Sequence, residues 1–338
     1  MAYSESIITT VTGIPALIVS FAGSRGWAVS GSTITPPSGT RSFTISAAIN
    51  GTNNRQHRVT IVDSADPART VWTQLPWVNG VSGNPAILTP TKLHLFGNNT
   101  PWSPAPWIGI VIECGYNQYR HMFIGSLAKI GAYTGGEVIS ANGFDSTASG
   151  SSGINTFDSV DNHFLFGARN FGNGVATPIE TQSGGVNVVH ANNANSWRIF
   201  EASFSGTARH SYTGNEVFGG HGDGVNDGMV RRGVSDYAGS NILVPVALFV
   251  PDSTNFGTDV RFRAIGHPPG VRMIDMRGIA PAQTIDVGGE DWMVFPEFVK
   301  NEAQSVPFGT ARPDGGVGGY YPTTETSYRL GLAYQTGA

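Results

Sequence analysis

The stretch Ser42-Phe-Thr-Ile-Ser-Ala47 alternates polar and apolar side chains residue by residue. Successive side chains of a β-strand point to opposite faces, so this alternation predicts a half-buried strand. The same period of two recurs at Val59 with Ile61, at Leu93 with Leu95, and over residues 200–204. We therefore expect an all-β fold, mainly antiparallel sandwiches or barrels, with long loops and little helix. Clusters of turn-forming residues separate the strands at residues 36–39, 50–51, 142–143 and 314–316.

Helical periodicity is scarce. The best helical candidate, residues 121–130, is short and contains Gly125, so one or two turns of helix and a further strand are both consistent with it. The apolar run at residues 242–250 is well short of the roughly 20 residues that a membrane span needs, and we interpret it as a core strand. Pro245 cannot donate a ladder hydrogen bond, so this strand is expected to lie at an edge, carry a bulge or break there.

The chain is long enough for two domains, because 338 residues exceed the size at which a single core keeps growing. Residues 141–155 are nearly all small and polar and are typical of a linker. We predict an N-terminal β-rich domain over residues 1–145 and a C-terminal β-rich domain over residues 146–338. A flexible segment, residues 301–320, precedes a strand-like tail at 328–334. That tail either closes its own domain or pairs with a neighbouring subunit.

The composition favours an assembly component over an enzyme. Only 13% of the residues are charged, about half of the roughly 25% typical of soluble domains, so other protein is expected to cover part of the surface. Lysine occurs only at positions 92, 129 and 300, and arginine tolerates burial at interfaces better than lysine does. A GC-rich genome would produce the same bias. The arginines that we single out as interface candidates are Arg231, Arg232, Arg261, Arg263, Arg272 and Arg277.

Several classes of partner are not expected. No basic cluster is longer than Arg231-Arg232, so specific nucleic-acid binding is not predicted. The first residues, MAYSESIITTVTG, lack the basic and long apolar regions of a secretory signal, which indicates synthesis in a cytoplasm without a signal peptide. The single cysteine, Cys114, lies in an apolar run and is read as a buried, inert thiol. No membrane insertion and no cofactor are predicted.

The chain contains none of the common local catalytic motifs, such as the nucleophile elbow, the HExxH zinc motif or the phosphate loop, so we predict that it is not an enzyme. The acids best suited to general acid and base chemistry stand beside apolar strands, where burial would raise a carboxyl pKa. Either two of these acids form a pair that cleaves glycans, or all of them face solvent or are paired at an interface. These acids are Glu113, Glu137, Glu290 and Asp291.

Two further segments carry candidate binding residues. The loop 219–228 places His221, Asp223, Asn226 and Asp227 close together, but Val225 stands where a calcium loop needs a ligand, and an Asx-rich turn explains the loop equally well. The eight histidines are dispersed, and Arg120-His121 is expected at a turn or a strand end. Four tryptophans alternate with prolines. They could form a platform on which sugar rings stack, or they could belong to a proline-stiffened loop. These tryptophans are Trp72, Trp77, Trp102 and Trp107.

Five phrases of the sequence resemble virion structural proteins of the tail or tail tip of tailed bacteriophages. The resemblance implies a β-rich structural subunit of a phage virion, in the tail, tail tip or baseplate, that assembles with copies of itself and with other virion proteins. The alternatives are a carbohydrate-binding or carbohydrate-cleaving tail protein that contacts host surface glycan, and a capsid decoration protein. The phrases are YRHMFIG (119–125), GAYTGGEV (131–138), IGHPPGVR (265–272), GGEDWMVFP (288–296) and GLAY (331–334).

Overall fold

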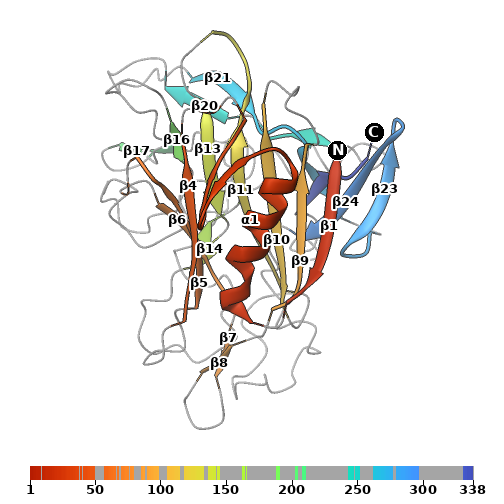
Figure 1. Ribbon diagram of the computed structural model, residues 1–338. Helices are drawn as coiled ribbons and strands as arrows, with labels where there is room; N and C mark the ends of the chain where they lie inside the picture. The colour runs from red at the N-terminus through yellow and green to blue at the C-terminus, as the bar shows by residue number, and fades with distance from the viewer. Residues whose placement is uncertain are drawn as a thin grey trace.

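A computed structural model shows a fold made almost entirely of antiparallel β-sheets (Figure 1), which confirms the predicted all-β class. None of the sheets closes into a barrel over the residues that the structure describes. Those residues are 1–8, 10–37, 39, 41–49, 57–65, 67, 70–75, 77–79, 85–87, 90–98, 105–114, 118–132, 136–141, 143–144, 162–163, 165, 188–190, 202–204, 208–210, 243–246, 248–251, 262–276, 279–296 and 330–337.

The largest sheet has six strands, and we call it the central sheet. Neighbouring strands pair in the order β1 (Ala2–Ile7), β9 (Pro90–Gly97), β10 (Trp107–Cys114), β11 (Gln118–Ser126), β13 (Glu137–Ala141) and β16 (Val188–His190). Residues 121–130, which the sequence allowed to be either a short helix or a strand, therefore lie mostly in strand β11. Because His121 lies in the middle of this strand, the expectation that it marks a turn or strand end is wrong.

A five-stranded sheet, called here the N-terminal sheet, contains the alternating stretch that opened the sequence. Its order is β2 (Ala28–Ser30), β3 (Thr33–Thr35), β4 (Phe43–Ala48), β5 (Arg58–Asp63) and β6 (Thr70–Gln74). Phe43 and Ile45 of β4 are buried, while Thr44 between them is half-buried. The period of two therefore predicted both the strand and its buried face.

The one α-helix in the described residues, α1 (Ile14–Ser24), follows a single 3₁₀ turn, η1 (Val11–Gly13), and was not predicted. Apolar residues occupy most positions of this helix, so the sequence shows little of the contrast between faces that a helical period requires. Pro15 in the first turn is a helix-start signal, because its missing N–H has no partner there in any helix.

A second five-stranded sheet, the C-terminal sheet, contains the tail of the chain. Its order is β19 (Val244–Pro245), β22 (Val271–Asp275), β25 (Leu330–Gln335), β24 (Glu290–Pro296) and β23 (Gln283–Val287). Strand β25 pairs with β22 and β24 of its own chain, as one of the two readings of the tail predicted. Pro245 lies in the edge strand β19, and the next strand, β20 (Leu248–Pro251), belongs to another sheet, so the expected edge and break are confirmed.

The remaining strands form small sheets. One has three strands, β12 (Ala128–Lys129), β21 (Phe262–His267) and β20. The two-stranded sheets pair β7 (Trp77–Asn79) with β8 (Pro85–Ile87), β14 (Gly143–Phe144) with β15 (Asn162–His163), and β17 (Ala202–Phe204) with β18 (Ala208–His210).

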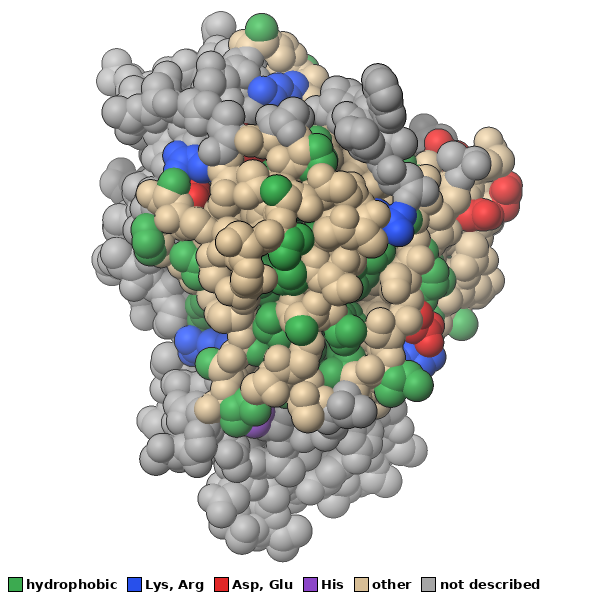
Figure 2. Space-filling view, viewed as in Figure 1, with side chains coloured by type: hydrophobic (Ala, Val, Ile, Leu, Met, Phe, Trp, Pro, Cys, Tyr) green, Lys and Arg blue, Asp and Glu red, His purple; other side chains and the backbone are tan. Residues whose placement is uncertain are grey.

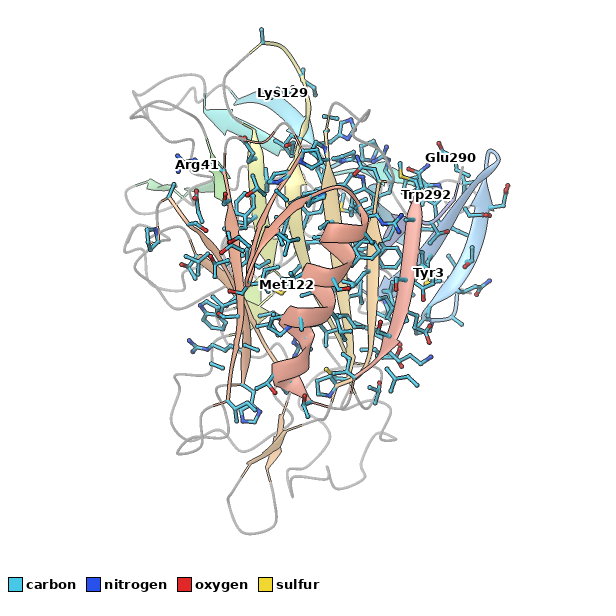
Figure 3. All side chains as sticks on the ribbon, in the orientation of Figure 1. Tyr3, Arg41, Met122, Lys129, Glu290 and Trp292 are labelled. Atoms are coloured by element: carbon cyan, nitrogen blue, oxygen red, sulfur yellow. The ribbon has the colours of Figure 1, made fainter. Side chains whose placement is uncertain are left out.

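The central sheet is packed on both faces, so the fold has three layers. Leu93, Ile110 and Met122 point into a core shared with α1 and the N-terminal sheet. On the other face, the Phe96 ring stacks on the ring of Tyr334 in the C-terminal sheet, with 4.7 Å between centroids. Figure 1 shows α1 in front of the central strands, and Figure 3 shows Met122 beside the helix.

The predicted boundary between residues 145 and 146 stays a prediction. Described strands from its two sides pair with each other, β13 with β16 and β12 with β21. Within the described part of the chain, no helix is long and apolar enough to cross a membrane.

Candidate functional site

Most of the predicted site residues lie outside the described residues, and for them the predictions stand as made. They are His221, Asp223, Asn226 and Asp227 of the candidate metal loop, the arginines Arg231, Arg232, Arg261 and Arg277, and Trp102. Arg263 lies on β21 and Trp77 on β7, and for these two residues only the backbone is described. Among the described residues, no group of three or more His, Cys, Asp or Glu side chains could hold a metal ion.

Two of the four candidate tryptophans belong to the core. Trp107 is fully buried, and its ring is stacked on Phe123 with 6.1 Å between centroids. Trp72 is 6% exposed, and the guanidinium of Arg58 lies 3.8 Å from its ring centroid. A sugar ring stacks on an exposed aromatic face, so Trp72 and Trp107 offer none in this structure.

The side chain of Arg272 is engaged within its own chain. Its Nη1 donates to the Val271 carbonyl oxygen at 2.8 Å, and its guanidinium lies 5.4 Å from the Trp292 ring centroid. Burial lowers the pKa of Arg272, and the nearby charge of Glu290 opposes that shift. Arg272 remains an interface candidate only through the part of its side chain that stays exposed.

The candidate acids do not converge as a glycan-cleaving pair would. Glu113 and Glu137 lie on β10 and β13, with β11 between them. Their partners on β11 are Tyr119 and Ser126, so the two acids are roughly 20 Å apart along the strands, whereas glycosidases need about 5–10 Å. Glu290 and Asp291 are neighbours in one strand, where successive side chains point to opposite faces.

The structure instead brings together five polar side chains that sequence reasoning did not connect. We call them the Tyr3–His94 cluster; they are Tyr3, Glu5, Lys92, His94 and Glu113. Tyr3 donates its hydroxyl proton to Glu5 Oε2 at 3.1 Å, and the same hydroxyl oxygen lies 2.9 Å from His94 Nδ1. On the other side of the ring, His94 Nε2 lies 3.1 Å from Glu113 Oε2, and Lys92 Nζ lies 3.2 Å from Glu5 Oε1.

Strand pairing is what assembles this cluster. Glu5 of the edge strand β1 stands opposite His94 of β9, and His94 stands opposite Val111 of β10. His94 is 1% exposed, and the Phe295 ring of the C-terminal sheet covers it at 4.9 Å between centroids. Figure 3 shows Tyr3 on β1, beside the C-terminal sheet.

The electrostatics of the cluster argue against a nucleophilic tyrosine. Burial raises the pKa of Tyr3, and the hydrogen bond and charge of Glu5 together with the charge of Glu113 raise it further. Burial alone would raise the pKa of Glu5, but hydrogen bonds from Lys92 and Tyr3 outweigh it and lower that pKa. Tyr3 therefore keeps its proton as a hydrogen-bond donor, and Glu5 is an ionised acceptor.

A second buried histidine joins the central and C-terminal sheets. His121 Nε2 lies 2.7 Å from the Pro296 carbonyl oxygen, which can only accept, so Nε2 donates. Burial lowers the pKa of His121 to about 3, so the ring is neutral, and its Nδ1 accepts from the Tyr334 hydroxyl at 2.8 Å. His121 therefore acts as a fixed structural bridge rather than as an acid or base.

No residue within α1 is charged, and the first charge after it is Arg25, the C-cap, whose Nε donates to Ser24 Oγ at 3.1 Å. Residues 6–24 contain no Asp, Glu, Lys or Arg. The helix buries Ile14, Ile18, Phe21 and Ala22 against the core. We name its exposed side, together with the adjoining Val29, the α1 face, and define it by Ala16, Ser20, Gly23, Ser24 and Val29.

Figure 2 shows that the described surface around the α1 face has few charged side chains. Val29 is 46% exposed, and a Cβ atom added to Gly23 would lie 3.4 Å from Val29 Cγ2, so helix and strand form one continuous surface. A helix that meets water on one side normally carries charged or polar residues there.

Comparison of the chain with models of known protein families and with curated proteins finds no match.

Proposed function

We propose that this chain is a structural subunit of a bacteriophage virion, in the tail, tail tip or baseplate, and that it assembles through subunit interfaces with copies of itself and with other virion proteins. The observation that carries the proposal is the uncharged α1 face, on a chain in which only 13% of the residues are charged. The cores of protein interfaces are depleted of charge relative to the rest of the surface.

The sequence phrases behind the phage resemblance support a structural role. YRHMFIG lies on β11, GGEDWMVFP runs from the β23–β24 turn through β24, and GLAY lies on β25. Phe123, Phe295 and Tyr334 from these phrases are all fully buried. At these three positions the resemblance therefore concerns residues of the core.

The glycan alternative draws less support from the described residues. Trp72 and Trp107 are buried, and the candidate acids do not converge. We therefore propose the assembly role. Glycan binding through Trp77 and Trp102 is a separate hypothesis.

The test is to place one charge on the α1 face. Ser20→Arg should leave the fold intact, because arginine is a better helix former than serine and a positive charge suits the C-terminal half of a helix. We expect this variant to weaken self-association at least about tenfold in analytical ultracentrifugation, since a charge in an interface core must be desolvated. The matched control is Thr284→Arg, at an exposed position on β23, which should associate as the wild type does.

Equal association of Ser20→Arg and the wild type would contradict the role of the α1 face. The virion assignment has its own test, since peptides of this chain are expected in purified particles of the phage that encodes it. Their absence from the particles would contradict that assignment.

A further inference from the structure

Strand β1 leaves one edge of the central sheet open (Figure 1). The Ile8 N–H donates to the Thr91 carbonyl oxygen at 3.1 Å, so the even-numbered residues of this segment turn their backbone groups toward β9. Backbone groups alternate in direction along a strand, and Tyr3, Glu5 and Ile7 therefore direct theirs away from β9. Within the described part of the chain, these three residues have no backbone hydrogen bond on that outer side. Their N–H donors and C=O acceptors stand in a row along the edge.

This edge is accessible and lacks the usual protection. Ile7 is 78% exposed, and Glu5 is exposed as well. Proteins protect edge strands by keeping them very short, or with proline, a bulge or lysine. Two of these devices occur at other described edges, since β19 contains Pro245 and β2 and β16 have three residues each. Strand β1 has six residues, no proline and no register shift against β9.

We propose that β1 pairs antiparallel with β1 of a second copy, about a two-fold axis at Ser4, so that the central sheet continues from one chain into the next. An extended backbone supplies an acceptor for each outward N–H and a donor for each outward C=O, which is how a strand adds to a sheet edge. A two-fold axis makes the same patch serve both copies. This inference rests on the proposed self-assembly but uses a surface apart from the α1 face.

The charge of Glu5 selects the register of this pairing. Outward-directed residues must face one another, so the axis passes through a residue rather than between two. An axis at Ser4 pairs residues 2–6 of the two strands, an axis at Glu5 pairs residues 3–7, and every other axis shortens the ladder. The axis at Glu5 sets two carboxylates directly opposite each other, which is destabilising. The axis at Ser4 sets Glu5 opposite Tyr3 of the second copy, and each Glu5 keeps Lys92 of its own chain at 3.2 Å.

The side chains of β1 suit a close approach of two strands. Ala2, Ser4 and Ser6 share one face and are half-buried. An axis at Ser4 places the two Ser4 side chains opposite each other and Ala2 opposite Ser6, so only small groups meet on this face. On the other face, Tyr3 is held by its hydrogen bond to Glu5 at 3.1 Å and by its ring stacked on Phe96, with 5.1 Å between centroids. The edge is therefore ordered before a second copy arrives, which lowers the entropic cost of pairing.

The experiment is disulfide cross-linking of Ser4→Cys in the full chain under mild oxidation, read as dimer on a non-reducing gel. The two Ser4 residues form a pair without backbone hydrogen bonds, whose Cα atoms lie about 4.5 Å apart, within the range of a disulfide. The matched control is Ser6→Cys, on the same face, where the two copies lie roughly 13 Å apart along the strands and cannot be bridged. We expect at least about tenfold more dimer from Ser4→Cys than from Ser6→Cys. The native Cys114 is buried.

A proline separates backbone pairing from side-chain effects. Glu5→Pro removes an outward N–H and adds a ring at the edge, but it spares the bonds to β9, because the backbone groups of Glu5 point away from that strand. Combined with Ser4→Cys, it should lower the yield of cross-linked dimer at least about fivefold. Glu5→Gln keeps the N–H and should retain the full yield.

The proposal is overturned if Ser4→Cys gives no cross-linked dimer, or if Ser4→Cys and Ser6→Cys give equal yields. A full yield in the presence of Glu5→Pro overturns it as well. These outcomes are distinct from those that test the α1 face, because Ser4→Cys combined with Ser20→Arg should still cross-link. A cross-link at position 4 in a chain whose association Ser20→Arg does not weaken would support pairing through β1 and contradict the role of the α1 face.

Discussion

The two faces of the central sheet are packed with different chemistry. Toward α1 and the N-terminal sheet it presents aliphatic and sulfur-containing side chains, among them Leu95, Ile110 and Met122. Toward the C-terminal sheet it presents rings such as Phe96 and His121, which meet Phe295 and Tyr334. Aliphatic packing specifies volume, whereas stacked rings and buried hydrogen bonds also specify orientation. Both faces bury large apolar side chains, and the second also fixes the orientation in which the C-terminal sheet is docked.

The largest effect is expected on the aliphatic face. Ile110→Ala removes a fully buried side chain between the central sheet and the α1 core, and should lower the free energy of unfolding by about 2–5 kcal/mol. Chemical denaturation measures this loss. Ile110→Val, the control, keeps most of the volume and should cost about 0.5–1.5 kcal/mol. A loss below about 1 kcal/mol for the alanine variant would show that this core is not tightly packed.

An effect of similar size is expected at the turn that closes over Trp107. Gly270 has φ +64°, and a Cβ atom there would overlap the Trp107 ring. Gly270→Ala should cost about 1–3 kcal/mol for the overlap, beyond the roughly 1–2 kcal/mol for placing alanine at positive φ. Gly288→Ala is the control, because its φ of +67° is similar but no atom lies within 4 Å of the added Cβ. Equal losses of stability in the two variants would contradict close packing of the turn on Trp107.

The third-largest loss of stability is expected when the hydrogen bond between Tyr334 and His121 is removed. Tyr334→Phe keeps the stacked ring but removes the hydroxyl 2.8 Å from His121 Nδ1, which leaves a buried acceptor without its donor. We expect a loss of about 1–3 kcal/mol in the free energy of unfolding, toward the lower end of that range because the aromatic packing is retained. An unchanged denaturation midpoint would mean that the hydroxyl does not contribute.

The smallest effect is the pH dependence from His121. Its pKa is about 3 in the folded chain, below the ordinary value of about 6.5, so the unfolded chain binds more protons between these values. Stability therefore falls as the pH falls, by about 1 kcal/mol between about pH 6.5 and about pH 5.5. Denaturation at these two pH values should show a smaller difference in His121→Gln than in the wild type. A difference of equal size in both proteins would assign the effect to other groups.

Period-two alternation predicted strands correctly, but it predicted the burial of their faces only in part, because the strand at Leu93 and Leu95 is buried on both faces rather than on one. In β4 one face is buried and the other is not, so Phe43 and Ile45 alternate with polar residues. Strand β10 lies in the middle layer and is buried on both faces, which removes the alternation and leaves a continuous apolar run. The helix α1 was missed because its exposed side also lacks charged residues.

The side-chain clusters were beyond sequence reasoning for a different reason. Tyr3 meets His94 only because β1 pairs with β9 in one register, and a shift by one residue would turn Tyr3 to the opposite face. Trp107 follows a proline-rich segment that is typical of a surface loop, yet the turn before β22 covers it. Neither contact leaves a local signal, since each joins segments far apart in the chain.

The measurement that tests the assembly role most directly is the solution mass of the purified wild-type chain by light scattering across a concentration series. The account predicts a defined multiple of 35.7 kDa that persists on dilution into the micromolar range. A mass of 35.7 kDa at every concentration would contradict self-assembly through the α1 face.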